Sequence, residues 1–353
     1  MYAYAGGCLD EEDLFLLEEL GDRERRWKPE VPYYTYDPFD FESITSDESY
    51  INFRFWKEDI PRVMAGLRIP DIITTYNRVN VSGTEAFCLL LRRLAYPCRL
   101  SDIAKEFFGQ RPIPVLSVVV KHMLDYLHDN FASRLLTTLD QPWLSPHRLQ
   151  QFADSIHARG AALANCWAFM DGTVRHISRP SQFQEECYNG HKRVHALKYQ
   201  SVLTPNGLVA NLFGPIEARH HDAYLFSESK ISQQLERFCF NASGEVMVIY
   251  ADPAYPIREH LIAPYGSALT PLQSEFNSSM SKVRVAAEWG FKEIIKSFAF
   301  VDFKKSQQIN LTAVGKQYLV AALLQNLRSC LYGNQTSTFF GVDPPSLEAY
   351  LSG

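Results

Sequence analysis

Three acidic residues stand where their side chains could bind metal ions. Asp171 and Asp252 each follow a short apolar run that predicts a β-strand, and Glu288 lies in a predicted helix farther along the chain. Ligands of open α/β sheets gather outside the strand ends, so we expect these carboxylates to line one cleft. Three carboxylates ~4 Å apart would repel one another by about 4 kcal/mol per pair at a dielectric constant of ~20, and divalent cations remove that cost. The acids therefore predict a site for Mg²⁺ or Mn²⁺, with two ions acting on a phosphodiester bond.

Each of these acids also has a plainer interpretation. Asp171 precedes a glycine and Asp252 precedes a proline, and both pairs are common in turns. Glu288 has Arg284 and Lys292 one helical turn away on either side, so it could simply be their partner on the helix surface. Spacing alone leaves this choice open.

A fourth acid, Asp222, is a rival for the second aspartate because His220 and His221 precede it. Asp222 also stands directly before a helical stretch, and aspartate is a favoured N-cap residue. We therefore expect it to cap a helix or to support the site without binding the metal. Arg284 is expected in a supporting role from the same helix face as Glu288.

Basic residues near the acids are expected to contact DNA phosphates, which bind such side chains irrespective of base sequence. The alternative is ordinary solvated charge on the surface. The candidates are Arg175, Lys192, Arg193, Lys198, Lys292 and Lys296.

The elements that must position these residues change character near residue 164, where the hydrophobic period falls from 3.6 to 2. From there the chain predicts the order β, β, β, α, β, short β, α. This order indicates the α/β class and is that of a ribonuclease H-like catalytic domain with a mixed sheet. The predicted strands are 166–170, 194–203, 208–213, 245–251 and 260–264, and the predicted helices are 222–237, 274–297 and 311–331.

Residues 61–163 predict a helical region ahead of this catalytic domain. Ser101 and Ser117 are natural N-caps of two consecutive helices with a helix-turn-helix rhythm. The second begins with Val118–Val120, which favours packing in a core over reading bases, although both remain open. The predicted helices are 83–94, 101–108, 116–128 and 148–159.

The two ends of the chain predict an acidic arm over residues 1–60, with a short helix at 11–20, and a C-terminal tail over 333–353. The arm holds 16 acidic and 6 basic residues, a net charge of −10, whereas the rest holds 24 and 29, a net charge of +5. The negative charge of the arm therefore offsets the positive charge of the rest of the chain, which could bind phosphate. The seven cysteines lack C-x-x-C spacing, and no apolar run approaches ~18 residues, so a soluble intracellular protein with reduced thiols and no membrane contact is expected.

Over residues 83–351 the sequence resembles the PIF/Harbinger superfamily of DNA transposases and the nucleases derived from them. Several motifs carry the resemblance together, in the family's order, although each would be weak alone. These segments are Leu89–Pro97, Asn165–Thr173, Tyr188–Arg193 with His195 and Lys198, Gly214–Asp222, Ala251–Pro256 and Arg284–Glu288.

The resemblance places the family's catalytic and metal-binding acids on Asp171, Asp252 and Glu288. It implies a D-D-E endonuclease that uses two Mg²⁺ or Mn²⁺ ions and can also transfer DNA strands. It further implies a separate Myb/SANT-like partner that supplies DNA binding and brings the protein from the cytoplasm into the nucleus. Its assembly could be monomeric or oligomeric.

Two other functions compete with the transposase-like nuclease. A domesticated copy could keep the fold as a catalytically quiet module that binds DNA or protein. A general metal phosphohydrolase would cleave small phosphate esters and leave DNA intact. A cleavage assay on plasmid DNA separates these hypotheses.

Overall fold

The structure is a computed structural model that describes residues 39–352, except 110, 267 and 310. The helix expected at 11–20 lies outside the described residues. Within the described part, the buried apolar side chains form one continuous cluster that includes residues on both sides of position 163. The helical region and the sheet therefore share a core.

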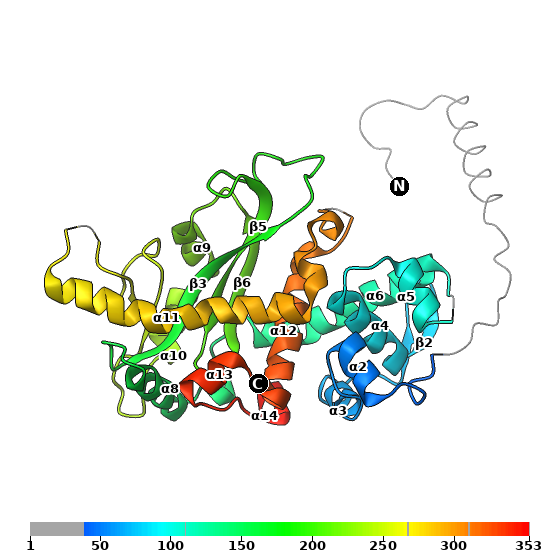
Figure 1. The fold of residues 1–353 in the computed structure, drawn as a ribbon, viewed down its shortest axis with the longest axis horizontal. Helices are drawn as coiled ribbons and strands as arrows, with labels where there is room; N and C mark the ends of the chain where they lie inside the picture. Colours follow the sequence, from blue (N-terminus) through cyan, green and yellow to red (C-terminus); the bar gives the residue numbers. More distant parts are fainter. Residues whose placement is uncertain (1–38, 110, 267, 310, 353) are drawn as a thin grey trace, which may run out of the picture. The chain divides into compact units, whose positions relative to one another are not determined.

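A mixed β-sheet lies at the centre of the C-terminal half, as expected for the α/β class (Figure 1). Its strands follow the order β6–β5–β3–β7–β8, and β4 pairs with the start of β5. β3 runs antiparallel to β5 and parallel to β7, and β8 is parallel to β7. The strands are β3 (Cys166–His176), β4 (Tyr188–Asn189), β5 (Val194–Leu203), β6 (Val209–Glu217), β7 (Val248–Tyr250) and β8 (Leu261–Ile262).

The two faces of the sheet carry different helices because side chains alternate along each strand. On one face Leu203 lies against Gly290, and Tyr199 packs against Tyr318 with 4.5 Å between ring centroids. On the other face Lys198 and Gln200 contact the segment after β6. The first face carries α11 (Pro271–Ser297), α12 (Val314–Tyr332) and α13 (Gln335–Phe340), and the second carries α9 (Asp222–Ser229), followed by α10 (Ile231–Phe238).

The region before the sheet is mainly helical, as predicted. The two expected serine caps are wrong, because Ser101 and Ser117 lie inside helices whose N-cap residues are Arg99 and Pro112. A small hairpin of β1 (Ile72–Thr74) and β2 (Asn80–Ser82) was not predicted. The helices are α2 (Ser46–Phe53), α3 (Asp59–Gly66), α4 (Gly83–Ala95), α5 (Leu100–Glu106), α6 (Ile113–Leu127), α7 (Ser133–Leu135) and α8 (Pro146–Ala158), with a π-helical turn at His128–Ala132.

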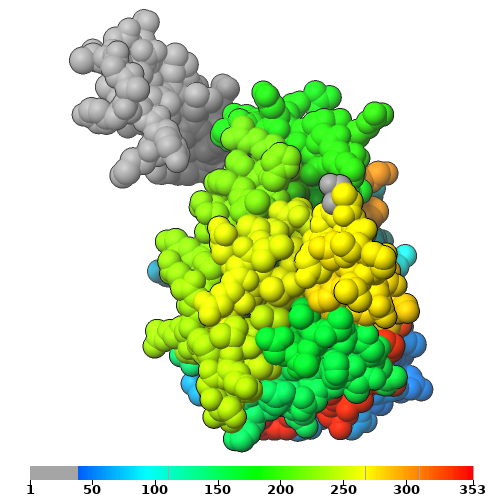
Figure 2. Space-filling view, turned by 90° about the vertical axis from the view of Figure 1, so that its left-hand side faces the viewer, coloured from blue at the N-terminus to red at the C-terminus, as the bar shows by residue number. Residues whose placement is uncertain are grey.

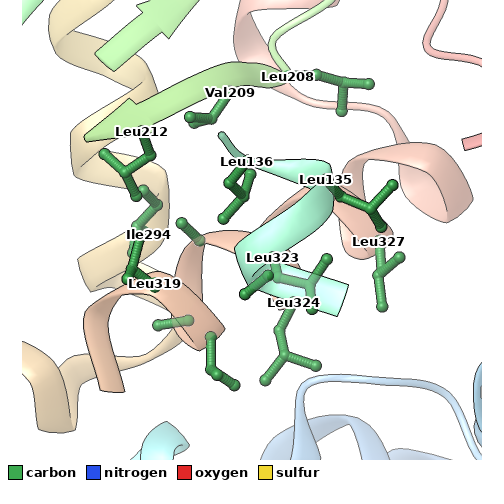
Figure 3. Packing of buried hydrophobic residues seen from close by; sticks show 14 of the residues in the cluster. Leu135, Leu136, Leu208, Val209, Leu212, Ile294, Leu319, Leu323, Leu324 and Leu327 are labelled. Atoms are coloured by element: carbon green, nitrogen blue, oxygen red, sulfur yellow. The ribbon is translucent and has the colours of Figure 1, made fainter. Parts of the chain in front are cut away.

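The centre of the core is the helix α12, most of whose residues are buried. Figure 3 shows its leucines facing Leu136 from the helical region and Leu212 from β6. The backbone N–H of Leu212 donates to the carbonyl of Leu136 at 2.6 Å. The last helix, α14 (Leu347–Leu351), also packs against α12, so the stretch expected as a tail contributes to the core.

Asn326 of α12 is the main polar group in this core. It is 1 % exposed and bonds both backbone groups of Val209, with Oδ1 accepting from N at 2.9 Å and Nδ2 donating to O at 2.9 Å. Nδ2 also donates to the Tyr350 hydroxyl at 2.8 Å. One side chain therefore completes the hydrogen bonding of a buried strand end and of a buried tyrosine.

We expect Asn326→Ala to lower the free energy of unfolding by about 3 kcal/mol or more, because it leaves three buried polar groups unpaired. Tyr350→Phe removes one of these bonds and should cost about 1 kcal/mol. Urea denaturation of both variants checks the difference. Equal losses would show that the bonds to Val209 contribute little.

The six described cysteines are all free thiols, and four of them are buried. Among the described residues, no helix combines the length and apolar character needed to cross a membrane.

Candidate active site

The register of the two central parallel strands brings Asp171 and Asp252 level with each other. Phe169 of β3 pairs with Tyr250 of β7, and each aspartate follows its paired residue by two positions. Asp171 was expected at the end of a strand, but β3 continues to His176 because β5 still pairs with it. Asp171 therefore marks the point where β3 runs on without β7, which opens one edge of the strand beside both acids.

Arg284 of α11 lies between the two aspartates. Its Nη1 is 3.5 Å from Asp171 Oδ1, and its Nη2 is 3.6 Å from Asp252 Oδ2. Nη1 is buried and has no hydrogen-bond acceptor among the described residues. At these distances the guanidinium attracts both carboxylates electrostatically without forming close hydrogen bonds. It therefore acts as a counter-cation for Asp171 and Asp252.

The carboxyl group of Asp171 lies in a poorly solvated position. Burial raises its pKa, and this effect outweighs the opposing attraction of Arg284 and the hydrogen bond from the Gly172 amide at 3.0 Å. The negative charges of Asp252 and Glu288 raise the pKa further. Both other acids of the predicted triad thus affect the ionisation of Asp171. A positive charge added beside it would favour its ionised form.

Glu288 does not join the aspartates in one ligand cluster. Its side chain is 53 % exposed and pairs with Lys292 at 3.4 Å, on the same helix. No group of three or more His, Cys, Asp or Glu side chains in the described part of the chain lies close enough to hold a metal ion. The expected convergence of three carboxylates is therefore not seen in the described residues. Arg284 lies between two of them, and the third pairs with Lys292 on the exposed face of α11.

The ligand chemistry of the aspartate pair nevertheless fits a divalent cation. Carboxylate oxygens are the donors that Mg²⁺ and Mn²⁺ prefer. The buried, unpartnered Nη1 of Arg284 shows that the space between Asp171 and Asp252 already accommodates positive charge. The two aspartates are thus suitable metal ligands once the guanidinium has moved aside.

Asp222 lies behind this pair, on the other face of β3. Its Oδ1 accepts a hydrogen bond from Lys198 Nζ at 2.8 Å. It would lie 3.2 Å from a Cβ at Gly172, so the missing side chain of that glycine lets it approach the strand. The expected capping role is wrong, since Asp222 is the first residue of α9 and His221 is the N-cap. Its other expected role, support without metal binding, fits this placement.

We expect Asp222→Asn to lower DNA cleavage by about tenfold, far less than Asp252→Asn. The asparagine keeps the shape but removes the charge that neutralises the buried Lys198, at a cost of about 2 kcal/mol in stability. Adding Lys198→Met should recover most of that stability. Cleavage rates and melting temperatures of the single and double variants measure both effects. Equal loss of cleavage in the Asp222 and Asp252 variants would reopen the assignment of the second aspartate.

Tyr255 was not predicted as part of the site. Its hydroxyl is buried without a hydrogen-bond partner in the described structure and would lie 3.4 Å from a Cβ at Gly172. Burial raises its pKa, and the charges of Asp222, Asp171 and Asp252 raise it further. The hydroxyl therefore stays protonated beside the acids and can donate a hydrogen bond. Tyr255 lies three residues after Asp252, within the segment Ala251–Pro256 that carries the family resemblance. This proximity to Asp252 could have identified it from the sequence.

The six predicted phosphate contacts fall into two groups. Arg175 donates to Thr173 at 2.7 Å and lies over the Tyr318 ring, and it is 8 % exposed. Lys198 is 9 % exposed and paired with Asp222. Direct phosphate contacts do not fit these two placements. The exposed members are Lys192, Arg193, Lys292 and Lys296.

Asp171 on β3 and Asp252, two residues after the end of the parallel strand β7, form an acidic pair beside Arg284 of α11. Paired carboxylates of this kind have the ligand chemistry that metal-assisted cleavage of phosphodiesters requires. Residues 170–326 match the model of a family described as DDE superfamily endonuclease. The match includes Asp171, Asp252 and Glu288 and supports a DDE transposase-like family for this part of the chain. Comparison with curated proteins and with solved structures gives no significant match.

Proposed function

We propose that the protein is a divalent-metal-dependent DNA endonuclease of the transposase type. The observation that carries this proposal is the pair Asp171 and Asp252, level in the sheet and sharing Arg284, within a segment similar to DDE endonucleases. Such a pair is costly to maintain without a cation, and a phosphodiester substrate with its metal ions would supply the matching charges.

More specifically, we propose that the protein is a PIF/Harbinger-type transposase with a ribonuclease H-like catalytic domain. The strand order β6–β5–β3–β7–β8 and the parallel pairing of β3, β7 and β8 support that domain. The consecutive helices α5 and α6 support a helix-turn-helix-like unit, although Val119 is buried in the core. Strand transfer, nuclear entry from the cytoplasm and a separate Myb/SANT-like partner belong to the same proposal.

In this function Asp171 and Asp252 would hold Mg²⁺ or Mn²⁺, and Glu288 would join them after leaving Lys292. The bound ions would supply Lewis-acid stabilisation of the phosphate oxygens and a more acidic water. Arg284 neutralises the aspartates when they stand alone and is placed to bind a phosphate oxygen of the substrate. Tyr255 carries a protonated hydroxyl close to the Asp222 side of β3.

The test is cleavage of supercoiled plasmid DNA by the purified chain with Mg²⁺ or Mn²⁺. We expect nicked and linear products with either ion and none with EDTA. A parallel reaction with p-nitrophenyl phosphate distinguishes a general phosphohydrolase. Hydrolysis of that ester with no cleavage of DNA would overturn the proposal.

A catalytically quiet binding module is the second candidate. The separation of Glu288 from the aspartates and the position of Arg284 between them favour it. In a quiet module these interactions would persist with metal and DNA present. Plasmid that stays intact with both ions, while DNA still binds, would establish this candidate.

The chain alone should bind transposon-end DNA weakly. Residues 61–353 carry a net charge of only +5, and the acidic stretch before them opposes even that. The slope of log affinity against log salt should be shallow, at about 0.9 per phosphate contact. Titrations against putative transposon ends and scrambled DNA check this. Tight, sequence-selective binding at physiological salt without a partner would contradict it and would assign base reading to α6.

A further inference from the structure

A pocket of about 480 Å³ lies next to the acids, on the face of the sheet that carries α9. One wall is the turn between β4 and β5, and the other is the loop between β6 and α9. Gly172 of β3 and Lys198 of β5 contribute to its floor. In Figure 2 the segments that follow β3, coloured bright green, stand above the yellow-green and yellow segments of residues 210–270.

The charged groups of this pocket are mostly basic. Three cations, Lys192, Lys198 and Arg219, line it together with a single carboxylate, that of Asp222. Lys198 already neutralises Asp222 at 2.8 Å. Within the described residues, neither Lys192 nor Arg219 has an ionic partner, and both are exposed. Three histidines add further donors: His191, His220 and His221.

Buried side chains hold the two walls together. Asn189 is 8 % exposed, donates from Nδ2 to the Ala218 carbonyl at 3.0 Å, and accepts at Oδ1 from the Lys192 amide at 2.8 Å. Lys198 Nζ donates to the His220 carbonyl at 2.8 Å. The walls are therefore fixed before any ligand arrives, which lowers the ordering cost of binding.

The pocket reaches the acids through the residues that follow them. Gly172 comes directly after Asp171, and Ala254, which also lines the pocket, donates its amide to Asp252 Oδ1 at 3.0 Å. Asp171 and Gly172 face opposite sides of β3, so the pocket and the acids share the edge where β3 extends beyond β7. Phosphates recur about every 3.4 Å of helix axis along each DNA strand. DNA lying across this edge therefore brings further phosphates to the pocket.

We propose that this pocket binds a backbone phosphate of the DNA strand whose neighbouring phosphate lies at the acids, with Lys192 and Arg219 as its charged ligands. This inference rests on the proposed function, since it assumes that DNA is the substrate. The pocket fixes the position of the strand relative to Asp171 and Asp252 without reading bases. It also explains how a chain with a net charge of −5 can hold DNA locally.

Gly190, at the tip of the β4–β5 turn, offers a clean test. A Cβ at this position meets nothing within 4 Å, and the backbone is not left-handed there. Gly190→Asp therefore adds a negative charge to the pocket without a clash, and Gly190→Ala is its matched control. Lys192→Ala with Arg219→Ala removes the cations, and Arg237→Ala on α10 removes an exposed cation outside the pocket.

Binding of a fluorescein-labelled 30-base-pair duplex is measured by anisotropy in EDTA, at 20–150 mM salt. We expect Gly190→Asp and the double variant each to weaken binding about tenfold, with the double variant lowering the salt slope by about 0.9 per lost contact. Gly190→Ala and Arg237→Ala should stay within about twofold of wild type. Wild-type affinity with unchanged slope in the charge variants, equal loss in Gly190→Ala, or no binding by wild type at 20 mM salt would each overturn the proposal.

Inorganic phosphate distinguishes a free anion from the DNA backbone as the ligand. At constant ionic strength it should compete with the duplex for wild type but not for Gly190→Asp. Phosphate binding that depends on the pocket, with DNA affinity that does not, would also overturn the proposal. Because EDTA prevents cleavage, the result is independent of catalysis: pocket-dependent binding with no nuclease activity refutes the proposed function alone, and cleavage with no pocket effect refutes this inference alone.

Discussion

Asp171→Asn and Asp252→Asn should each lower metal-dependent plasmid cleavage by about 10³-fold or more. Each change keeps the shape of the side chain but replaces an anionic oxygen ligand with a neutral amide. Glu288→Gln should also nearly abolish cleavage if that residue moves to the metal. The triple variant should be hardly slower than the slowest single variant, because the acids act as one unit. Normal cutting by any single variant would remove that residue from the site.

The melting temperature of Asp171→Asn distinguishes a loss of activity from a loss of the fold. Because burial raises the pKa of Asp171, its ionised form costs stability, and that cost grows as the pH rises through the raised pKa. Asparagine is neutral throughout. Without metal, Asp171→Asn should therefore melt no lower than wild type at neutral pH, and its advantage should shrink toward pH 4. A lower melting temperature at pH 7 would contradict the account of Asp171 as a buried, poorly solvated acid.

The second large effect concerns Arg284, the only basic group in the described structure that contacts both aspartates. Arg284→Met keeps much of the side chain's bulk but leaves two like charges facing each other. Without metal, the variant should lose about 1–3 kcal/mol of stability, and Mn²⁺ should restore it. Calorimetric titration should show Mn²⁺ binding about tenfold more tightly than to wild type, since a competing interaction worth about 1.4 kcal/mol has gone.

Cleavage separates the two roles of this arginine. Despite its tighter metal binding, Arg284→Met should cleave plasmid about 10²-fold more slowly, because the guanidinium is also placed to bind the substrate phosphate. Arg284→Lys restores the charge and should recover the stability while recovering the rate only in part. Weaker Mn²⁺ binding by Arg284→Met would show that the arginine supports the metal site and does not compete with it.

Most strands and long helices could be predicted because their hydrophobic periods are clear. The turn of Thr204–Gly207 between β5 and β6 formed as its Asn-Gly pair indicates, with Gly207 at φ +77°. The helix expected over 222–237 instead divides into α9 and α10, because Lys230 adopts a left-handed φ of 51°. Glycine and asparagine adopt this conformation more often than lysine does, so the sequence at Lys230 does not indicate that the helix ends there.

At the site, strand pairing brings two of the three predicted acids level, and the contacts around them differ from those expected. Asp171 and Asp252 follow apolar runs, and strand pairing alone makes them level. The positions of the basic side chains around them depend on contacts between residues far apart in the sequence. Arg175 was expected at a phosphate, but its neighbours Thr173 and Tyr318 draw it into the core. Arg284, expected in a supporting role on the helix face of Glu288, lies between the aspartates because α11 crosses the sheet beside them.

The central position of α12 has a consequence for how this chain can be divided. One side of the helix packs on β6 and another on α6 and the turn after it, and Lys316 at its start pairs with Asp125 at 2.7 Å and Asp129 at 3.2 Å. A fragment beginning at residue 164 would expose the leucines that now meet Leu135 and Leu136. The helical region is thus part of the same folded unit as the sheet. A recombination or proteolytic cut between the two regions should therefore expose apolar surface on both fragments and leave neither able to keep its present fold.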